Sequence, residues 1–134
     1  MSKAMIAWCL CGSKKHYDVC CGPFHLNKAF PQTAKQLMRS RYVAYALHLE
    51  AYLLSTWAKT TRPGRIEFEN GLSWEDLKIL KTHQGRKKDQ QGRVTFKATF
   101  KVGLEQGVMI EKSQFIRNHS FHWVYLGCDE SSFK

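Results

Sequence analysis

The sequence has no long apolar run and lacks the common catalytic motifs. No stretch approaches the roughly 18 consecutive apolar residues that a membrane-spanning helix needs, so we expect no membrane insertion. No apolar segment precedes Cys9, which makes the N-terminus a poor secretory signal and favours a cytoplasmic location. A glycine-rich phosphate loop, a nucleophile elbow and a dinucleotide-binding fingerprint are also absent. An enzymatic function therefore has no motif to support it.

Acidic side chains are scarce. Of 134 residues, 11 are Asp or Glu and 21 are Lys or Arg, which gives a formal net charge of +10. The basic excess lies within residues 1–48 and 59–101, and it includes the run Arg86-Lys87-Lys88 at an expected hairpin tip. Such charge attracts acidic partners, so we expect an acidic protein segment, a chaperone or the ribosome. Aromatic platforms for bases are not evident, which limits expected nucleic-acid binding to non-specific contacts. A solubilising surface is the alternative interpretation.

Two parts are expected along the chain, and its 43% hydrophobic and 13% aromatic content argues against disorder. Residues 1–32 hold four of the 5 cysteines and two of the 3 prolines but few apolar residues. This module therefore needs a crosslink, such as a bound metal ion or a disulfide, to fold. Residues 33–134 form the main domain. We expect separate cores, so that Cys11→Ser would unfold residues 9–22 and spare the rest.

The main domain is expected to begin as a helix and to continue as strands. Residues 33–58 contain no glycine or proline and space apolar residues three to four apart, with Thr33 placed to cap the helix. A bend at His48 and Glu50 into a second short helix is the alternative, although the spacing does not demand one. From Val94 to Val102 apolar and polar residues alternate strictly, which indicates a half-buried antiparallel strand. Further strands are expected near Leu77, Val108 and Phe121. This order predicts an α+β fold, with the helix packed on an antiparallel sheet of about four strands.

The cysteines carry the most specific signal. Cys9, Cys11, Cys20 and Cys21 form two close pairs, whereas Cys128 stands alone near the end of the chain. Two such pairs can close a tetrahedral four-sulfur site, for which zinc is the first expectation and iron an alternative. With all four positions filled, the ion would be structural. A redox site and structural disulfides are the other interpretations, although neither suits a cytosolic chain.

A second group of residues is a candidate ligand site. Arg39, Arg41, Trp57 and Arg62 could hold an anionic small molecule, because arginines bind anions through bidentate contacts. The alternatives are arginines that pair with glutamates or face solvent, and a tryptophan that fills the core. No histidine or carboxylate has the spacing of an acid–base pair, so we assign no catalytic residue.

The cysteine segment also carries a family resemblance. Cys9-Leu-Cys11-Gly-Ser followed by Tyr17-Asp-Val-Cys20-Cys21-Gly resembles the SEC-C motif, the zinc knuckle at the C-terminus of the SecA preprotein translocase ATPase. The rest of the chain is similar to the YchJ-like bacterial proteins, whose own activity is unassigned. The matching pieces are Thr33-Ala34, Leu37–Tyr42, Ala44, Tyr52-Leu53, Thr56-Trp57, Thr61–Pro63, Glu111-x-Ser113-x-Phe115 and Trp123-x-Tyr125-x-x-Gly127. The resemblance implies a SEC-C knuckle followed by a cone-shaped, cystatin-like α+β domain, as in nuclear transport factor two and scytalone dehydratase.

Three departures from the family pattern limit what the resemblance implies. Leu10 replaces the usual proline between the first two cysteines, a change that spares the ligands. Ala58 stands where the family often has a histidine, so no role for that histidine carries over. The second knuckle that some relatives have at the C-terminus is not in this sequence.

These patterns favour a non-enzymatic, metal-binding adaptor or binding protein, and the SecA resemblance links it to protein export or ribosome-associated processes. A small-molecule-binding or enzymatic pocket for an anionic ligand, inside the cone, is the second hypothesis. Non-specific RNA binding is the third. An open pocket with a carboxylate or histidine beside the arginines would favour the second hypothesis, and a pocket plugged by Trp57 and phenylalanines would exclude it.

Overall fold

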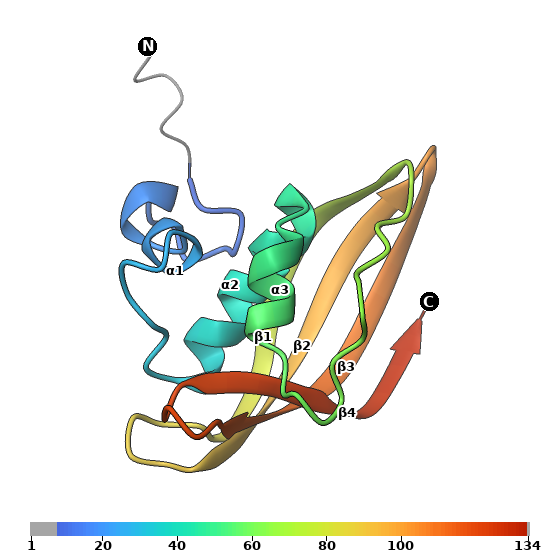
Figure 1. Ribbon diagram of the computed structural model, residues 1–134. Helices are drawn as coiled ribbons and strands as arrows, with labels where there is room; N and C mark the ends of the chain where they lie inside the picture. The colour runs from blue at the N-terminus through green and yellow to red at the C-terminus, as the bar shows by residue number, and fades with distance from the viewer. Residues whose placement is uncertain (1–7, 134) are drawn as a thin grey trace.

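The helices lie on one face of a curved antiparallel sheet, as the sequence predicts (Figure 1). The structure, a computed structural model, describes residues 8–133. The expectation that no secretory signal precedes Cys9 falls mainly on residues outside that range. Within residues 8–133, no helix combines the length and apolar character needed to cross a membrane.

The first described segment, residues 8–25, is the cysteine-rich knuckle. It contains the short 3-10 helix η2 (Tyr17–Val19) and the single-turn helix α1 (Gly22–His25). The backbones of Trp8 and His16 form an isolated antiparallel bridge that closes the first loop of the knuckle. Figure 1 shows the knuckle beside the long helix that comes after it.

Two helices, rather than one, come after the knuckle. Helix α2 (Ala34–Leu47) begins after Thr33, whose Oγ1 accepts a hydrogen bond from the Gln36 N–H at 3.1 Å, which confirms the predicted cap. It ends at His48, where φ of 59° and ψ of 45° are left-handed. Helix α3 (Glu50–Ser55) then starts in a new direction, so the alternative of a bend at His48 and Glu50 is confirmed over one continuous helix. The change of direction buries Leu53 of α3, which forms a small cluster with Ala44 of α2.

The sheet is a meander of four antiparallel strands in sequence order. Its strands are β1 (Leu72–Gln84), β2 (Gln91–Val102), β3 (Glu105–Arg117) and β4 (Trp123–Phe133). The predicted alternation in β2 is confirmed, because Val94, Phe96 and Ala98 are buried while their neighbours are not. The first strand begins at Leu72, earlier than the expected Leu77.

The knuckle and the main domain share one core. Three cysteines of the knuckle are buried in the same apolar cluster as Leu37, Met38 and Tyr42 of α2 and Phe96 and Phe115 of the sheet. Adding a Cβ to Gly12 would bring it to 3.3 Å from the Leu77 carbonyl oxygen, so the knuckle also lies against β1. The expectation of two separate cores is therefore wrong, because the cysteine side chains themselves supply apolar surface to the domain.

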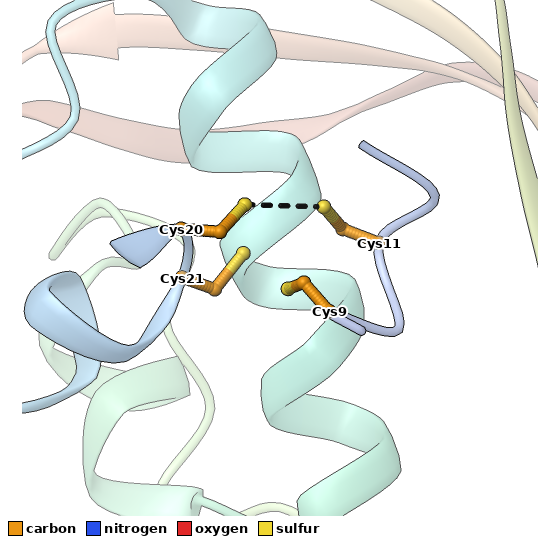
Figure 2. Close-up of side chains that lie close together, drawn as sticks. All are labelled: Cys9, Cys11, Cys20 and Cys21. Atoms are coloured by element: carbon orange, nitrogen blue, oxygen red, sulfur yellow. Dashed lines mark hydrogen bonds between the residues drawn. The ribbon is translucent and has the colours of Figure 1, made fainter. Parts of the chain in front are cut away.

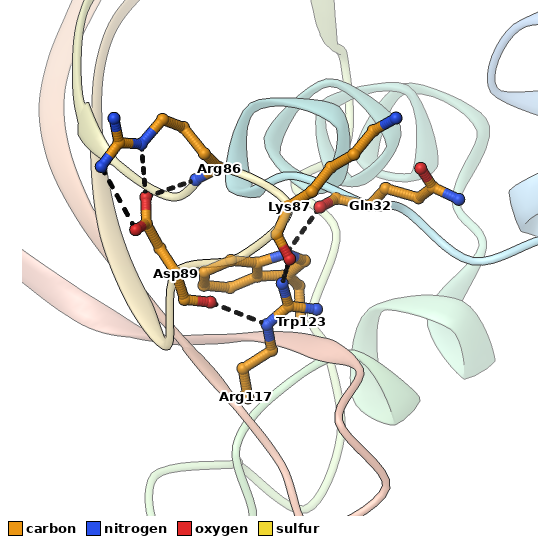
Figure 3. Close-up of polar contacts among 6 residues, drawn as sticks. All are labelled: Gln32, Arg86, Lys87, Asp89, Arg117 and Trp123. Atoms are coloured by element: carbon orange, nitrogen blue, oxygen red, sulfur yellow. Dashed lines mark hydrogen bonds and ion pairs between the residues drawn. The ribbon is translucent and has the colours of Figure 1, made fainter.

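The turns at the lower end of the sheet are tied together (Figure 3). Arg86 forms an ion pair with Asp89 at 2.8 Å, and the Asp89 carbonyl accepts a hydrogen bond from Arg117 Nε at 3.0 Å. The Arg117 guanidinium lies over the Trp123 ring, 4.2 Å from its centroid. The Trp123 Nε1–H in turn donates to the Gln32 carbonyl at 3.1 Å. Part of the basic run at this hairpin thus stabilises the fold.

Candidate metal centre

The four predicted ligands converge. The sulfur atoms of Cys9, Cys11, Cys20 and Cys21 all lie within 4.8 Å of one another, and Cys11 Sγ is 3.6 Å from Cys20 Sγ (Figure 2). One pair comes from the loop after Trp8 and the other from the chain between η2 and α1. None of these cysteines forms a disulfide. This separation suits four thiolates around one tetrahedral ion.

Local backbone geometry explains why the two pairs face each other. The Cys9 N–H donates to the Lys15 carbonyl at 2.7 Å, and the Gly12 N–H donates to the Cys9 carbonyl at 3.3 Å. Gly12 has φ of +83°, a left-handed conformation that glycine adopts without a Cβ clash. The tight turn therefore needs glycine at this position. On the other side, the Cys20 N–H donates to the Tyr17 carbonyl at 3.0 Å and fixes the second pair.

The cluster is buried, and its thiols share protons unequally. Cys9, Cys11 and Cys21 are at most 4% exposed, whereas Cys20 is partly exposed. Hydrogen bonds from Cys21 and Cys9 lower the pKa of the Cys11 thiol. The same contacts act in the opposite direction on the donors: the hydrogen bond to Cys11 raises the pKa of Cys9 to about 11 and raises that of Cys21. A divalent cation at the centre would displace these protons, because only thiolates bind it.

An arginine of α2 supplies the cation beside the cluster. Arg39 Nη1 donates to the Cys11 carbonyl at 2.6 Å and lies 3.9 Å from Cys11 Sγ. Four thiolates around a divalent ion would carry a net charge of −2, so a guanidinium here is electrostatically favourable. Arg39 was predicted to bind a small anion, and its described contacts are instead with the knuckle.

A histidine links the knuckle to the helices. His25 Nδ1 lies 2.6 Å from the Tyr17 hydroxyl, and its Nε2 lies 2.9 Å from the Ser40 carbonyl oxygen. Burial lowers the pKa of His25, which favours the neutral ring. The Ser40 side chain continues the network, with its Oγ 2.7 Å from the Tyr52 hydroxyl on α3. His25 therefore connects knuckle and helices and is not a fifth ligand.

The donor set fits a structural metal ion. Four cysteine sulfurs complete a tetrahedral shell and leave no position for water or substrate. Zinc and iron both accept this geometry, and either would be held by Cys9, Cys11, Cys20 and Cys21. When bound, the ion would supply a crosslink between the two loops, since the shell would be closed.

The remaining predicted site residues separate into two places. Arg41 and Trp57 line a common cavity between α2 and the sheet. Arg62 is exposed and lines a different hollow, which Trp57 also borders. The predicted group of four is thus split between the knuckle, the cavity and the surface.

The sequence patterns did not identify Glu111, which lies in the wall of the same cavity as Arg41. Glu111 pairs with Phe96 in the β2–β3 register, and Phe96 is on the buried face of β2. Its Oε2 accepts hydrogen bonds from Ser113 Oγ at 2.7 Å and from the Tyr125 hydroxyl at 3.2 Å. Residues alternate between the two faces of β3, and this alternation places the Glu111 carboxylate on the buried face. Only the register with β2 shows which face of β3 is the buried one.

Comparison with known proteins agrees with this architecture. The family model described as the YchJ middle NTF2-like domain matches residues 33–128. A UPF0225 protein from Streptomyces avermitilis is 42% identical over 125 residues, which cover 93% of this chain and 86% of that protein. A UPF0225 protein from Haemophilus influenzae is 43% identical over 123 residues, covering 88% and 74% of the two chains.

Two solved structures have the same fold. A SEC-C motif-containing protein from Rhodopseudomonas palustris superimposes with a TM-score of 0.80 at 29% identity, covering 92% of this chain and 98% of that one. Another from Psychrobacter arcticus gives a TM-score of 0.73 at 22% identity, with coverage of 91% and 80%. In this chain a four-cysteine knuckle precedes the matched NTF2-like domain. From the matched domain and these relatives, the chain belongs to the YchJ-like UPF0225 family.

Proposed function

We propose that this chain is a non-enzymatic binding protein in which one structural zinc ion holds the knuckle and a basic sheet face docks an acidic protein segment. The observation that carries the zinc assignment is the closed, buried set of four sulfurs. Zinc has no redox chemistry and favours tetrahedral thiolate sites. The proposal includes a reducing compartment such as the cytoplasm, because the four thiols must stay free to bind the ion.

Elemental analysis of freshly purified, reduced protein tests the metal assignment. We expect about one zinc per chain, and loss of that zinc in Cys11→Ser, because a closed site needs all four sulfurs. Cys128→Ser is the matched control, since Cys128 is exposed and lies outside the cluster. One iron per chain would mean that the structural ion is iron and not zinc. No metal in either protein would contradict it.

The basic docking face is the outer surface of β1 and β2, opposite the buried face that carries Val94 and Phe96. Lys78 and Lys97 are direct partners across the two strands, and Lys101 extends the row. None of these three lysines has an ion pair with a side chain of residues 8–129. Like charges placed directly opposite each other destabilise a sheet. Their presence supports a surface that an acidic partner neutralises.

The SecA resemblance suggests where such a partner would occur. We propose that the acidic segment belongs to a chaperone of protein export or to a ribosomal protein. Electrostatic attraction would speed association and would weaken with added salt.

Binding of a polyglutamate peptide tests the docking face. We expect retention at low salt that falls as the salt concentration rises, and a marked loss of retention in the double variant Lys78→Gln/Lys97→Gln. The double variant Lys14→Gln/Lys15→Gln removes the same charge from the knuckle and should bind nearly as well as the parent protein. Equal losses in both variants would mean that only net charge matters, which would contradict a defined face. Preferential binding of single-stranded RNA would favour the nucleic-acid alternative instead.

A further inference from the structure

A cavity of about 270 Å³ lies between α2 and the inner face of the sheet. It is separate from the knuckle and from the proposed docking face, and its walls are mostly apolar. The side chains that give the cavity its chemical character are Met38, Arg41, Trp57, Met109, Glu111 and Tyr125. Trp57 forms part of the wall and does not plug the space, so the sequence-based condition that would exclude a ligand is not met. Pockets of this kind, with a few placed polar groups, are typical ligand sites.

The cavity contains a buried cation without an ion pair. Arg41 is 3% exposed, and its Nη1 donates to the Leu53 carbonyl at 2.8 Å and to Thr56 Oγ1 at 2.7 Å. Its guanidinium carbon lies 4.9 Å from the Trp57 ring centroid and 4.8 Å from that of Tyr125. Within residues 8–129, Arg41 forms no ion pair with a carboxylate. A buried charge in this state is costly, and an anion would relieve that cost.

The tryptophan beside this arginine has an unused donor. Trp57 Nε1 is buried and has no hydrogen-bond partner among the residues that the structure describes. Buried donors are nearly always paired, so each exception calls for an explanation. The Trp57 ring packs edge-on against Tyr125, with ring centroids 5.1 Å apart, which holds the indole next to Arg41.

A carboxylate also faces the cavity. Glu111 accepts hydrogen bonds from Ser113 and Tyr125 through one oxygen, Oε2. No hydrogen bond within residues 8–133 goes to its other oxygen. Glu111 and Arg41 do not form an ion pair with each other, since no nitrogen–oxygen distance between them falls within 4.0 Å. The cavity therefore offers a cation and an indole donor together with a separate acceptor.

We propose that this cavity binds a small monocarboxylic acid with an apolar body. The carboxylate accepts hydrogen bonds from Arg41 and Trp57, and the body packs against Met38 and Met109. A hydroxyl or amino group on the body donates to Glu111. This site is independent of the docking face, so either proposal can fail without the other.

The wall chemistry selects a monoanion over other charges. A phosphate dianion requires several donors, and the cavity supplies one guanidinium, already hydrogen-bonded to two oxygen atoms, and one indole N–H. Glu111 would also repel the second negative charge. An organic cation would meet Arg41, a like charge in a low-dielectric site. A carboxylic acid needs two donors and carries one charge, which matches what the cavity supplies.

Nitrogen–proton NMR of the full, metal-loaded chain tests this site with phenylacetate as the probe. The indole N–H signals report on the 4 tryptophans separately, and Trp123, which already donates to the Gln32 carbonyl, is an internal reference. We expect phenylacetate to shift the Trp57 signal saturably and to leave the Trp123 signal in place. The neutral analogue phenylacetamide should bind about tenfold or more weakly, because it loses the charged hydrogen bond. Equal binding of the amide would overturn the anion assignment.

Two variants locate the probe. Arg41→Met should weaken phenylacetate binding by about tenfold or more. Because Arg41 also ties α2 to the end of α3, we add Met109→Trp, which fills the cavity from the sheet and leaves Arg41 in place. An unchanged Trp123 signal shows that each variant is folded. Arg62→Met is the matched control, because it removes an arginine from the neighbouring hollow that Trp57 also borders.

The outcomes separate the alternatives. Loss of binding in Arg41→Met and Met109→Trp, with normal binding in Arg62→Met, supports the proposal. Loss in Arg62→Met alone would place the probe in the outer hollow and overturn it. No Trp57 shift with phenylacetate, 4-hydroxyphenylacetate or octanoate at millimolar concentration would also overturn it. The donor to Glu111 has its own check: 4-hydroxyphenylacetate should bind more tightly than phenylacetate, and Glu111→Gln should change that difference.

Discussion

Helix α2 separates two polar regions that use arginine in opposite ways. Arg39 points to the knuckle, where it donates to the Cys11 carbonyl beside four sulfurs. Arg41, two residues later, points to the cavity, where two aromatic rings and two oxygen acceptors surround its charge. The knuckle is closed, since its four sulfurs fill a tetrahedral shell. The cavity is open, because Arg41 has no carboxylate partner and the Trp57 indole N–H has no acceptor within residues 8–129.

The knuckle and the cavity therefore have different roles. A closed shell has no position left for a substrate, so a metal ion held by the four sulfurs would stabilise the chain and would not bind a further ligand. Unpaired buried donors cost stability and are retained where they have another use. The knuckle thus stabilises the fold, whereas the cavity is the region where a ligand would add favourable contacts.

The largest expected effect comes from a substitution in the four-cysteine knuckle. Cys11→Ser removes one of four ligands from a cluster that is part of the main core, so we expect unfolding to become easier by roughly 4 kcal/mol or more. Thermal unfolding followed by tryptophan fluorescence, with and without added zinc, measures this effect. Cys128→Ser should unfold like the parent protein. Normal stability of residues 33–134 in Cys11→Ser would contradict the shared core and restore the two-core expectation.

Much of the fold can be predicted from local patterns in the sequence. The strict alternation from Val94 to Val102 identifies β2, and the absence of glycine and proline identifies the helical region. For the end of α2, local patterns offer a bend at His48 and Glu50 as an alternative but do not demand it. His48 adopts a left-handed conformation, which histidine seldom does, and burial of Leu53 against α2 stabilises the turn. That stabilisation comes from packing between two helices and leaves no local mark.

The candidate sites differ in the same respect. The four ligands of the knuckle lie within one short segment, so their spacing alone predicts the cluster. The cavity combines α2, the segment after α3 and strands β3 and β4, which only the tertiary fold brings together. Arg39 and Arg41 look alike in the sequence, yet they are about 200° apart around the helix, slightly more than half a turn, and therefore face different neighbours. Glu111 was missed for the same reason.

A smaller effect is expected from the arginine that faces the knuckle. Arg39→Met removes a charged hydrogen bond to the Cys11 carbonyl, which we expect to cost about 2 kcal/mol and to speed loss of zinc to a chelator. The measurement is the rate of zinc release, followed with a colorimetric chelator. Lys35→Met is the matched control, because Lys35 is exposed on the same helix and carries the same charge. Equal release rates in the two variants would show that Arg39 contributes only general charge, and phenylacetate binding should be unchanged in both.

The smallest expected effect acts on the helix that the two regions share. Thr33→Ala removes the side-chain oxygen that accepts from the Gln36 N–H, which should cost about 1 kcal/mol of unfolding free energy. Because α2 carries both Arg39 and Arg41, the loss should lower global stability without changing the zinc content or the affinity for phenylacetate. Denaturant unfolding gives the first quantity, and elemental analysis and NMR titration give the other two. Selective loss of zinc would mean that the start of α2 supports the knuckle directly. Selective loss of phenylacetate binding would mean that the start of the helix controls the cavity. Either result would contradict the separation of the knuckle from the cavity by α2.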